Sequence, residues 1–412
     1  NDLPPVEKSS LLKAMTDQIA HRGPDAYGEH VDDHAALGFR RLSIIDLKGG
    51  DQPIYNEDHN LVITFNGEIY NYQPLRERLI ALGHTFRTHA DTEVLLHGYE
   101  QWGVGLLRKI RGMFAFVIWD QEKQELFGAR DHFGIKPFYY AIMNGSFLYA
   151  SEIKALLPHP DFHKELNKEA IKPYLTFQYP ALHETFFKGV FKLPEGHYFT
   201  YSRGVMKVHR YYDEHFREIR QELKSLVDHI DQTVEDSVAA HQIADVEVGS
   251  FLSSGVDSSY VAAVARPEHT YSIGFGKGTY NESKQARELA DIIKLHNTSK
   301  ELTDEEAFSA FPQIQWYLDE PDSNPSCVPL FFLSQLAAQD VLSGEGADEL
   351  FAGYIDYGVH TTSKAIKTVT RWLGHLPARA RYAIAHWAKG KTFHGAMHLY
   401  ENLAPARESF IG

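Results

Sequence analysis

Two short loops rich in glycine and serine carry the residues whose types and spacing could do chemistry. One spans residues 251–259 (Phe-Leu-Ser-Ser-Gly-Val-Asp-Ser-Ser), and the other spans residues 342–351 (Leu-Ser-Gly-Glu-Gly-Ala-Asp-Glu-Leu-Phe). Each ends a hydrophobic stretch. Small residues let backbone N–H groups close around an anion, and the positive end of a following helix adds to the attraction. We therefore predict that both loops bind phosphate groups.

Each loop also holds an aspartate, which a phosphate would repel. Asp257 lies in the first loop and Asp348 in the second. A divalent cation between carboxylate and phosphate removes that repulsion, and Mg²⁺ prefers such oxygen ligands. The sequence therefore predicts that Asp257 and Asp348 hold Mg²⁺ on the phosphates of a nucleoside triphosphate.

The first loop differs from the common P-loop, whose pattern is G-x-x-x-x-G-K-[ST]. A Gly-Lys-Thr does occur at Gly390, but Ala385 stands where the first glycine belongs. Residues 253–258 instead resemble the pyrophosphate loop of the N-type ATP pyrophosphatases, roughly S-G-G-x-D-S, with Ser254 where glycine is commoner. That resemblance implies cleavage of ATP to AMP and pyrophosphate. An ordinary strand-to-helix turn is the alternative, and the second loop argues against it.

The N-terminal half adds several distinctive segments in order. They are His21–Asp25, Arg41–Asp46, Phe65–Asn71, Ala90–Glu93 and Arg130–Pro137. Together with Asp319-Glu-Pro321 and residues 343–349, they closely resemble the asparagine synthetase family, in which a class II glutamine amidotransferase domain precedes a synthetase domain. The resemblance covers nearly the whole chain.

The segment around Asn66 shows what the residues suggest by themselves. Leu61–Phe65 is typical of a strand, and Asn66-Gly67 is a strong turn pair. A plain hairpin turn is one interpretation. The other is an oxyanion hole, because such a turn can point a side-chain amide and a backbone N–H the same way. The family resemblance implies the oxyanion hole, at which Asn66 and Gly67 stabilise the tetrahedral intermediate of glutamine hydrolysis.

The resemblance also implies how glutamine is held. Arg41 would bind its α-carboxylate, since a guanidinium matches a carboxylate in a bidentate way, and Glu68 and Asp91 would receive its α-ammonium. Without the resemblance, Arg41 reads as a surface charge and the two acids as solvated turn or cap residues.

The nucleophile of that family is an N-terminal cysteine whose own α-amine acts as the base, with a pKa near ~7.7–8.0. This chain begins Asn1-Asp2-Leu3, and its one cysteine, Cys327, lies in the second half. Cys327 reads as a small buried thiol. We expect that residues preceding Asn1 supply the nucleophile, rather than that the protein uses free ammonia, because the glutamine-binding residues are retained.

Composition limits the classes of function. The 412 residues suggest two or three domains, and 43% hydrophobic residues are ample for large cores. A net charge of −14 argues against nucleic acid as a partner. A single cysteine fits a reducing cytoplasm, and we expect neither a secretory signal nor a membrane span. The histidines are scattered, with no close pair of ligand type, so the sequence predicts no zinc site. We expect no assembly larger than a homodimer.

The elements that must position these residues change in rhythm along the chain. Residues 1–209 alternate in short strands, which predicts an α+β domain of two packed sheets flanked by helices. The family resemblance implies that this domain is an Ntn-hydrolase-like αββα sandwich. The strands are expected at Ala36–Ile45, Leu61–Phe65, Phe114–Trp119, Glu125–Arg130, Pro137–Ala141 and Ser146–Ala150, with helices near 74–82 and 91–102. Residues 210–225 are expected to link this domain to the next.

Residues 226–412 show strand and helix alternation, which predicts an α/β domain with a doubly wound parallel sheet. The resemblance of the first loop implies that this domain is of the ATP pyrophosphatase type. Ligands of such sheets bind at the carboxyl ends of the strands. The strands are expected at Val246–Leu252 and Thr270–Phe275, and the helices at Ser258–Ala265, Glu282–Leu295, Pro329–Gln339 and within 361–412. The family continues beyond Gly412, so we expect part of this domain to be missing.

The two halves together imply a glutamine-dependent, ATP-consuming amidation of a carboxylate. Adenine would lie against the backbone of Leu252 and Ile273, and a carboxylate would attack the α-phosphorus of ATP to give an acyl-adenylate. The phosphates would contact the loop residues Ser253, Ser254, Gly255, Asp257, Ser258, Ser259, Ser343 and Gly344. Ammonia then displaces AMP, with Glu345 as its base; alternatively Glu345 only bonds to backbone amides at a helix start.

The acceptor carboxylate stays open. Aspartate is favoured, and diaminopimelate in a bacterial cell-wall precursor is an alternative of the same reaction class. A non-catalytic regulatory relative is the alternative of another class, and the retained Asp257, Glu345 and Asp348 argue against it.

Overall fold

The computed structural model describes residues 3–215, 219–276, 281–337, 340–354 and 373. The chain forms two compact units, which comprise residues 1–343 and residues 344–412. The helix predicted within 361–412 lies outside the described residues, apart from position 373. Among the described helices, none is both long and apolar enough to cross a bilayer.

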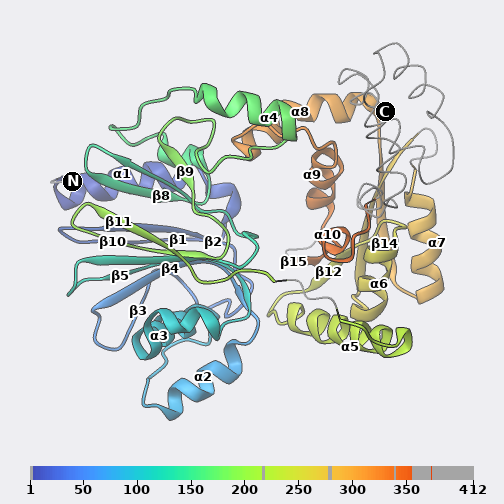
Figure 1. The fold of residues 1–412 in the computed structure, drawn as a ribbon, viewed down its shortest axis with the longest axis horizontal. Helices are drawn as coiled ribbons and strands as arrows, with labels where there is room; N and C mark the ends of the chain where they lie inside the picture. Colours follow the sequence, from blue (N-terminus) through green and yellow to red (C-terminus); the bar gives the residue numbers. More distant parts are fainter. Residues whose placement is uncertain (1–2, 216–218, 277–280, 338–339, 355–372, 374–412) are drawn as a thin grey trace. The chain divides into compact units, whose positions relative to one another are not determined.

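The first layer of the N-terminal half is a six-stranded antiparallel sheet (Figure 1). Its strand order is β11-β10-β6-β5-β4-β3. The strands are β3 (Ile54–Tyr55), β4 (Leu61–Ile69), β5 (Gly112–Asp120), β6 (Glu125–Arg130), β10 (His197–Ser202) and β11 (Val205–Arg210). Strands β4 and β5 pair along their whole length, from Leu61 opposite Asp120 to Ile69 opposite Gly112. This long pairing makes them the rigid centre of the domain.

The second layer consists of two smaller antiparallel sheets. One pairs β1 (Ala26–Val31) with β2 (Ala36–Arg41), and the other has the order β8-β7-β9. The strands of the latter are β7 (Tyr139–Met143), β8 (Ser146–Ala150) and β9 (Val190–Lys192). Apolar side chains of both layers, among them Leu37, Val62 and Phe138, form the core between them.

Helices cover the outer faces of the two layers. Helices α2 (Tyr72–Ala81) and α3 (Asp91–Trp102) pack on the six-stranded sheet, and α1 (Pro5–Asp17) packs on the second layer. The short helices and turns are η1 (Ala20–Arg22), η2 (Gly103–Arg108), η3 (Ile153–Leu156), η4 (Lys168–Ala170) and α4 (Ile171–Phe177). The order helix, sheet, sheet, helix confirms the predicted αββα sandwich.

The second half of the chain begins with α5 (Leu223–His241) and contains a parallel sheet of order β14-β13-β12-β15. Its strands are β12 (Val248–Phe251), β13 (His269–Phe275), β14 (His296–Leu302) and β15 (Asp340–Leu342), and its helices are α6 (Val256–Ala265), α7 (Ser283–Ile293), α8 (Asp304–Leu318) and α9 (Cys327–Leu336). After β12, the chain adds β13 and then β14 on one side of that strand, and β15 later pairs with the opposite edge of β12. This reversal of strand order confirms the predicted doubly wound fold.

Several elements differ from the sequence-based expectations. The strand expected to run to Ile45 ends at Arg41, because the following loop turns back to bind the Arg41 guanidinium through the carbonyls of Ile45 and Asp46. Helices α1 and α8 and strand β14 were not predicted. Polar residues interrupt β14, which contacts solvent over part of its length, so its alternation of apolar side chains is weak.

The predicted turn at Asn66-Gly67 is wrong. Both residues lie inside β4, which continues to Ile69. Pairing with Ala115 and Phe114 on β5 keeps the backbone extended there. The tertiary pairing therefore overrides the turn preference of the dipeptide.

Candidate active site

Asn66 and Gly67 lie on the central strand β4, where the sheet fixes their positions. The Nδ2 atom of Asn66 is buried and has no hydrogen-bond partner among the described residues. Gly67 has φ of 153°, and a Cβ there would collide with the carbonyl oxygen of Met113. A buried donor without an acceptor costs about 1–3 kcal/mol, so the fold holds it at a free-energy cost that an anionic ligand would remove.

Glu68 and Asp91 are two buried carboxylates beside this strand. Glu68 is 5% exposed, and burial together with the charge of Asp340 raises its pKa to about 7. Asp91 begins α3, where its Oδ2 accepts a hydrogen bond of 2.8 Å from the Ile69 N–H. Burial raises the pKa of Asp91 to about 6, although hydrogen bonds from the Ile69 and Thr92 N–H groups oppose that shift. A bound ammonium would favour the ionised form of both groups.

Arg41 ends β2 and is 5% exposed. Its Nη2 donates to the carbonyl oxygens of Asp46 at 2.6 Å and Ile45 at 3.1 Å, and its Nη1 donates to Asp51 Oδ1 at 2.9 Å. The Asp51 side chain is 69% exposed, so it is already largely solvated and a ligand carboxylate could replace it on Arg41 at little cost. The guanidinium is therefore held in place mainly by its own loop.

One cavity of about 590 Å³ joins these residues. Its polar end is lined by Arg41, Asn66, Gly67, Glu68 and Asp91, so the structure brings together all five residues predicted for glutamine. Lys136 lines the same end and was not assigned a role from the sequence, although its segment was singled out. Burial lowers the pKa of Lys136, while the neighbouring Glu68 opposes that shift.

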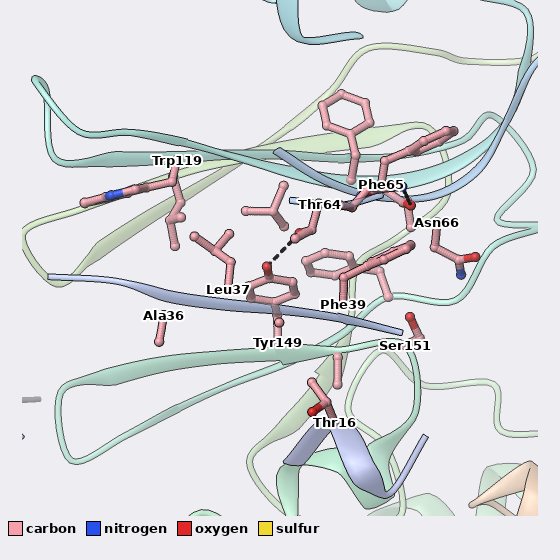
Figure 2. A pocket seen from close by; sticks show the side chains of 18 of the residues that line it. Thr16, Ala36, Leu37, Phe39, Thr64, Phe65, Asn66, Trp119, Tyr149 and Ser151 are labelled. Atoms are coloured by element: carbon pink, nitrogen blue, oxygen red, sulfur yellow. Dashed lines mark hydrogen bonds between the residues drawn. The ribbon is translucent and has the colours of Figure 1, made fainter. Parts of the chain in front are cut away.

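The rest of the cavity is a slot between two strand edges (Figure 2). Every residue of β2 and every residue of β8 lines it. Among the strands that the structure describes, β2 pairs with β1 alone, apart from an isolated bridge between Arg41 and Pro24, and β8 pairs with β7 alone. Tyr149 crosses the slot to bond Thr64 at 2.9 Å, and Asn66 lies at the end where Ser151 follows β8 (Figure 2). The slot has the shape and unpaired backbone edges that suit one more strand.

The first phosphate-type loop lies between β12 and α6. Leu252 is buried and bonds Tyr271 of β13, whereas Ser253, Ser254 and Gly255 are exposed. Within the loop, Ser253 Oγ accepts from the Gly255 N–H at 3.0 Å, and the hydroxyls of Ser253 and Ser258 are 2.8 Å apart. These bonds, formed within the loop itself, hold an exposed loop at the N-terminus of α6.

Asp257 lies in the first turn of α6 and is partly exposed, Ser259 follows on the same helix, and Ile273 lies on the neighbouring strand β13. Strand β15 pairs with β12 in parallel, Ser250 opposite Leu342, so the chain enters Ser343 at the same edge of the sheet as the first loop. This edge is the switch point of the doubly wound sheet, where such folds bind ligands.

Glu345 and Asp348 belong to the second unit. There Gly344 precedes Glu345, Gly346 adopts a left-handed conformation with φ of 88°, and α10 spans Ala347–Phe351. Asp348 is in the first turn of α10, and its carbonyl oxygen accepts from the Gly353 N–H at 2.9 Å. The predicted pairing of Asp348 with Asp257 on a metal ion stays a prediction.

The Asp-Glu pair at 319 and 320 contacts the N-terminal half. Asp319 has a left-handed φ of 61° and forms a 2.9 Å ion pair with the buried Lys154, which also pairs with Glu152. Glu320, 4% exposed, pairs with Lys192 at 2.7 Å and accepts from the Phe186 N–H at 3.0 Å. Sequence reasoning noted the motif but did not foresee these contacts, which join residues far apart in the chain.

The fold and these sites define a class of protein: an αββα sandwich domain followed by a doubly wound α/β domain. Comparison with known proteins narrows the class. Residues 4–212 match the model of the glutamine amidotransferase domain, and residues 229–406 match the model of asparagine synthase. The chain belongs to the family of glutamine-hydrolysing asparagine synthetases.

Two relatives illustrate the extent of the similarity. The chain is 39% identical to asparagine synthetase [glutamine-hydrolyzing] 1 of Bacillus subtilis over 99% of its own length and 65% of that protein. It is 36% identical to a putative asparagine synthetase [glutamine-hydrolyzing] of Mycobacterium tuberculosis over 99% of its own length and 67% of that protein. The chain thus spans about two thirds of the length of these curated relatives.

Proposed function

We propose that this chain hydrolyses glutamine in its N-terminal half and uses ATP in its second half to amidate a carboxylate, with aspartate giving asparagine. The observation that carries the proposal is the buried Asn66 Nδ2, which has no hydrogen-bond partner among the residues that the structure describes and lines a cavity together with Arg41, Glu68 and Asp91. A buried donor held in this way suits a group that acts on negative charge developing during a reaction.

Glutamine would bind by its two charged ends. The α-ammonium lies against Glu68 and Asp91, and the α-carboxylate displaces Asp51 from Arg41. The scissile amide then lies at Asn66 and Gly67, which donate hydrogen bonds to the oxyanion of the tetrahedral intermediate. Collapse of that intermediate releases ammonia, and water completes hydrolysis to glutamate.

We propose that a segment preceding Asn1 supplies the nucleophile for this step. The support is the slot between β2 and β8, whose facing edges pair with no other strand among the described residues and could accept a further strand. Such a strand would place an N-terminal cysteine near Asn66, with its α-amine as the base. Substitution of that cysteine by alanine in the gene-complete polypeptide is expected to abolish glutaminase activity and leave ammonium-dependent activity intact.

The second half would activate the acceptor. Adenine lies against the backbone of Leu252 and Ile273, and the phosphates lie on Ser253–Ser259 and on the Ser343-Gly344 turn. The acceptor carboxylate attacks the α-phosphorus, pyrophosphate leaves, and an acyl-adenylate forms. Ammonia attacks its carbonyl carbon, Glu345 accepts the proton, and AMP leaves with the P–O bond intact.

Asp257 fits a role in metal binding. It lies in the first turn of α6, next in the chain to Ser258, whose hydroxyl contacts that of Ser253, and carboxylates and hydroxyls are the hard oxygen donors that Mg²⁺ prefers. We propose that Asp257 and Asp348 hold Mg²⁺, which, when bound, neutralises the charge of the phosphates. Residues of the loop itself orient the α-phosphorus.

We further propose the domain boundaries, the cellular compartment and the oligomeric state. The glutaminase domain comprises residues 1–209, a linker spans 210–225, and the synthetase domain begins at 226. The protein acts in the cytoplasm, which its single cysteine favours. It assembles as a homodimer, which light scattering on the gene-complete polypeptide would test.

Pyrophosphate release by the gene-complete polypeptide tests the reaction. Ammonium is supplied first, so that the synthetase half is measured without the glutaminase half, and glutamine is supplied second. Release with aspartate and formation of asparagine are expected in both cases. Release only with a diaminopimelate-containing precursor would assign a different acceptor, and no release with any acceptor would refute the catalytic proposal.

A further inference from the structure

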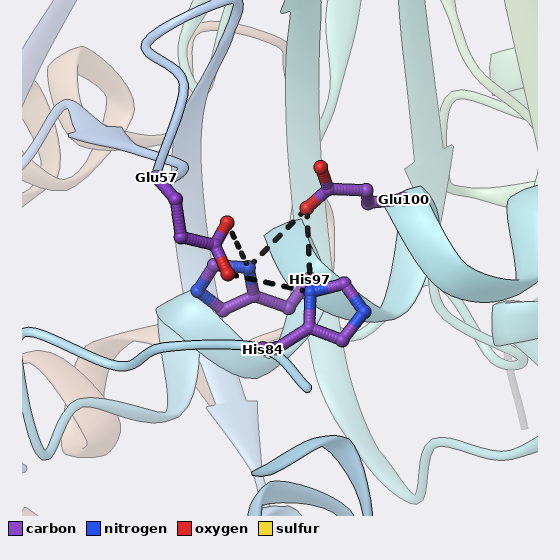
Figure 3. A group of neighbouring side chains, drawn as sticks. All are labelled: Glu57, His84, His97 and Glu100. Atoms are coloured by element: carbon purple, nitrogen blue, oxygen red, sulfur yellow. Dashed lines mark hydrogen bonds and ion pairs between the residues drawn. The ribbon is translucent and has the colours of Figure 1, made fainter. Parts of the chain in front are cut away.

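Two histidines and two glutamates meet on the outer side of the N-terminal domain (Figure 3). Glu57 lies in the turn between β3 and β4, His84 lies in the loop after α2, and His97 and Glu100 lie on α3. One ligand atom from each of the four lies within 4.8 Å of the others. Three separate segments of the chain therefore converge on one point.

The distances around this point match a tetrahedral metal site. His84 Nδ1 lies 3.5 Å from Glu57 Oε1 and 3.5 Å from Glu100 Oε2, and His97 Nδ1 lies 3.2 Å from Glu57 Oε2 and 3.4 Å from Glu100 Oε2. With metal–ligand bonds of about 2.0–2.1 Å, the ligands of tetrahedral Zn²⁺ lie about 3.3–3.4 Å apart. Charge-assisted N–H···O hydrogen bonds are shorter, about 2.7–2.9 Å.

The outer atom of each histidine is already bound by an acceptor. His97 Nε2 faces Glu93 Oε1 at 3.4 Å, and Glu93 is 1% exposed. His84 Nε2 faces the side-chain oxygen of Gln101 at 3.1 Å. Both Nε2 atoms therefore donate outward, so that the Nδ1 lone pairs of the neutral rings point inward. A carboxylate or amide behind a metal-bound histidine is the usual supporting arrangement.

The glutamates are oriented in the same way. Glu57 Oε1 accepts from the Thr85 N–H at 2.8 Å, and Glu100 Oε1 accepts from the Asn56 side-chain amide at 3.2 Å. These contacts turn the remaining carboxylate oxygens towards the histidines. In the tautomer in which both Nε2 atoms donate outward, the two Nδ1 lone pairs and the two carboxylates face one another, and a cation between them would remove their repulsion.

We propose that Glu57, His84, His97 and Glu100 bind one Zn²⁺ as a structural site. Neutral histidines and two carboxylates balance the charge of the ion, and imidazole with carboxylate is a donor set that Zn²⁺ accepts. The buried His97 forms the floor, whereas Glu57 and Glu100, 28% and 29% exposed, leave a path from solvent.

The ion would fasten α3 to the turn before β4 and to the loop after α2. Helix α3 begins at Asp91, which lines the cavity assigned to glutamine, and carries His97 and Glu100 farther along. The site therefore braces the helix that positions Asp91 while lying outside the proposed chemistry. Its occupancy can be tested whether or not the proposed reaction is correct.

Metal titration of the full chain tests the proposal. The protein is treated with a chelator, exchanged into metal-free buffer and titrated with Zn²⁺ in competition with a chromogenic chelator. Parallel titration with Co²⁺ records the intense visible d–d bands of four-coordinate cobalt. The variants are His84→Asn and Glu100→Gln, and the matched controls are His163→Asn and Glu77→Gln, at exposed positions outside the cluster.

We expect the unsubstituted protein and both controls to bind one Zn²⁺ per chain and to show the cobalt bands. Zn²⁺ at about a hundredfold excess over its Kd should raise the Tm by roughly 5–10 °C. His84→Asn and Glu100→Gln should weaken binding at least ~10-fold and lose the bands. Since Glu100 is partly exposed, its variant keeps the test available if His84→Asn does not fold.

Two results would overturn the proposal. One is the absence of both cobalt bands and a zinc-dependent Tm in the unsubstituted protein, which would mean that protons on the imidazoles hold the cluster together. The other is equal affinity in all variants, which would mean that Zn²⁺ binds to scattered surface histidines instead.

Discussion

Replacing Asn66 with alanine tests whether its side chain lowers the stability of the folded protein while it contributes to glutaminase activity. The Nδ2 atom is buried and finds no acceptor in the part of the chain that the structure describes, so the folded protein bears the desolvation cost of a donor, about 1–3 kcal/mol. Loss of an oxyanion donor reduces kcat by about 10²–10³-fold. We therefore expect Asn66→Ala to lose most glutaminase activity while its free energy of unfolding is unchanged or rises.

The two effects are measured on one preparation of the gene-complete polypeptide. Glutamate release reports the glutaminase, pyrophosphate release with ammonium reports the synthetase, and thermal unfolding reports stability. For a domain of this size, each kcal/mol changes the Tm by about 2–4 °C. The small cavity left by the truncated side chain offsets part of the gain, so an increase of a few degrees is the upper expectation.

A matched variant sharpens the interpretation. Thr64→Ala, two residues earlier on the same strand, removes the partner of Tyr149 and is expected to lower stability by about 1 kcal/mol. If Asn66→Ala instead kept glutaminase activity, or lost stability as Thr64→Ala does, Asn66 would be a structural residue and the reasoning from its unpartnered amide would be refuted.

Three further predictions concern the same molecule. Gly67→Ala should cost several kcal/mol in urea unfolding, because its Cβ would collide with the Met113 carbonyl on the paired strand, and unaltered stability would contradict the close approach. The Glu68 pKa of about 7 exceeds its ordinary 4.5, so its ionisation should lower the free energy of unfolding by about 3 kcal/mol as pH rises from 4.5 to 7. The KM for glutamine should rise below pH 7, because protonated Glu68 cannot pair with the α-ammonium. Glu68→Gln should flatten the pH dependence of both stability and KM. Lys154→Met should cost about 3–5 kcal/mol by leaving Asp319 buried without its cation, and glutamine-dependent synthesis should fall more than ammonium-dependent synthesis; equal losses would exclude a role in coupling the two halves.

Local sequence patterns predicted helices and strands correctly where the periodicity of the segment alone sets its structure. Helix α3 at Asp91–Trp102 and the strands Glu125–Arg130 and Ser146–Ala150 have the predicted bounds. In each, regular periodicity is bounded by a clear break, and burial of one face follows from that periodicity. The doubly wound order could likewise be predicted, because strand and helix alternation leaves few topologies for a parallel sheet.

Local patterns failed where a distant segment decides the backbone. Asn66-Gly67 favours a turn when considered alone, yet pairing with β5 keeps it in an extended strand. Arg41 was predicted to bind a ligand, and the structure adds that its own loop already binds most of the guanidinium. The contacts of Lys154 with Asp319 depend on two segments that have no common pattern.

From the sequence alone, the order of several short motifs identified the family resemblance and the two kinds of domain, and that resemblance implied which residues gather at the polar end of the cavity. The environment of those groups depends on the tertiary structure: Asn66 Nδ2, which has no partner among the described residues, and Glu68, whose pKa is raised, both owe these properties to burial. The tertiary structure alone also revealed the cluster around His97, since scattered histidines become ligands only when the fold brings three segments to one point.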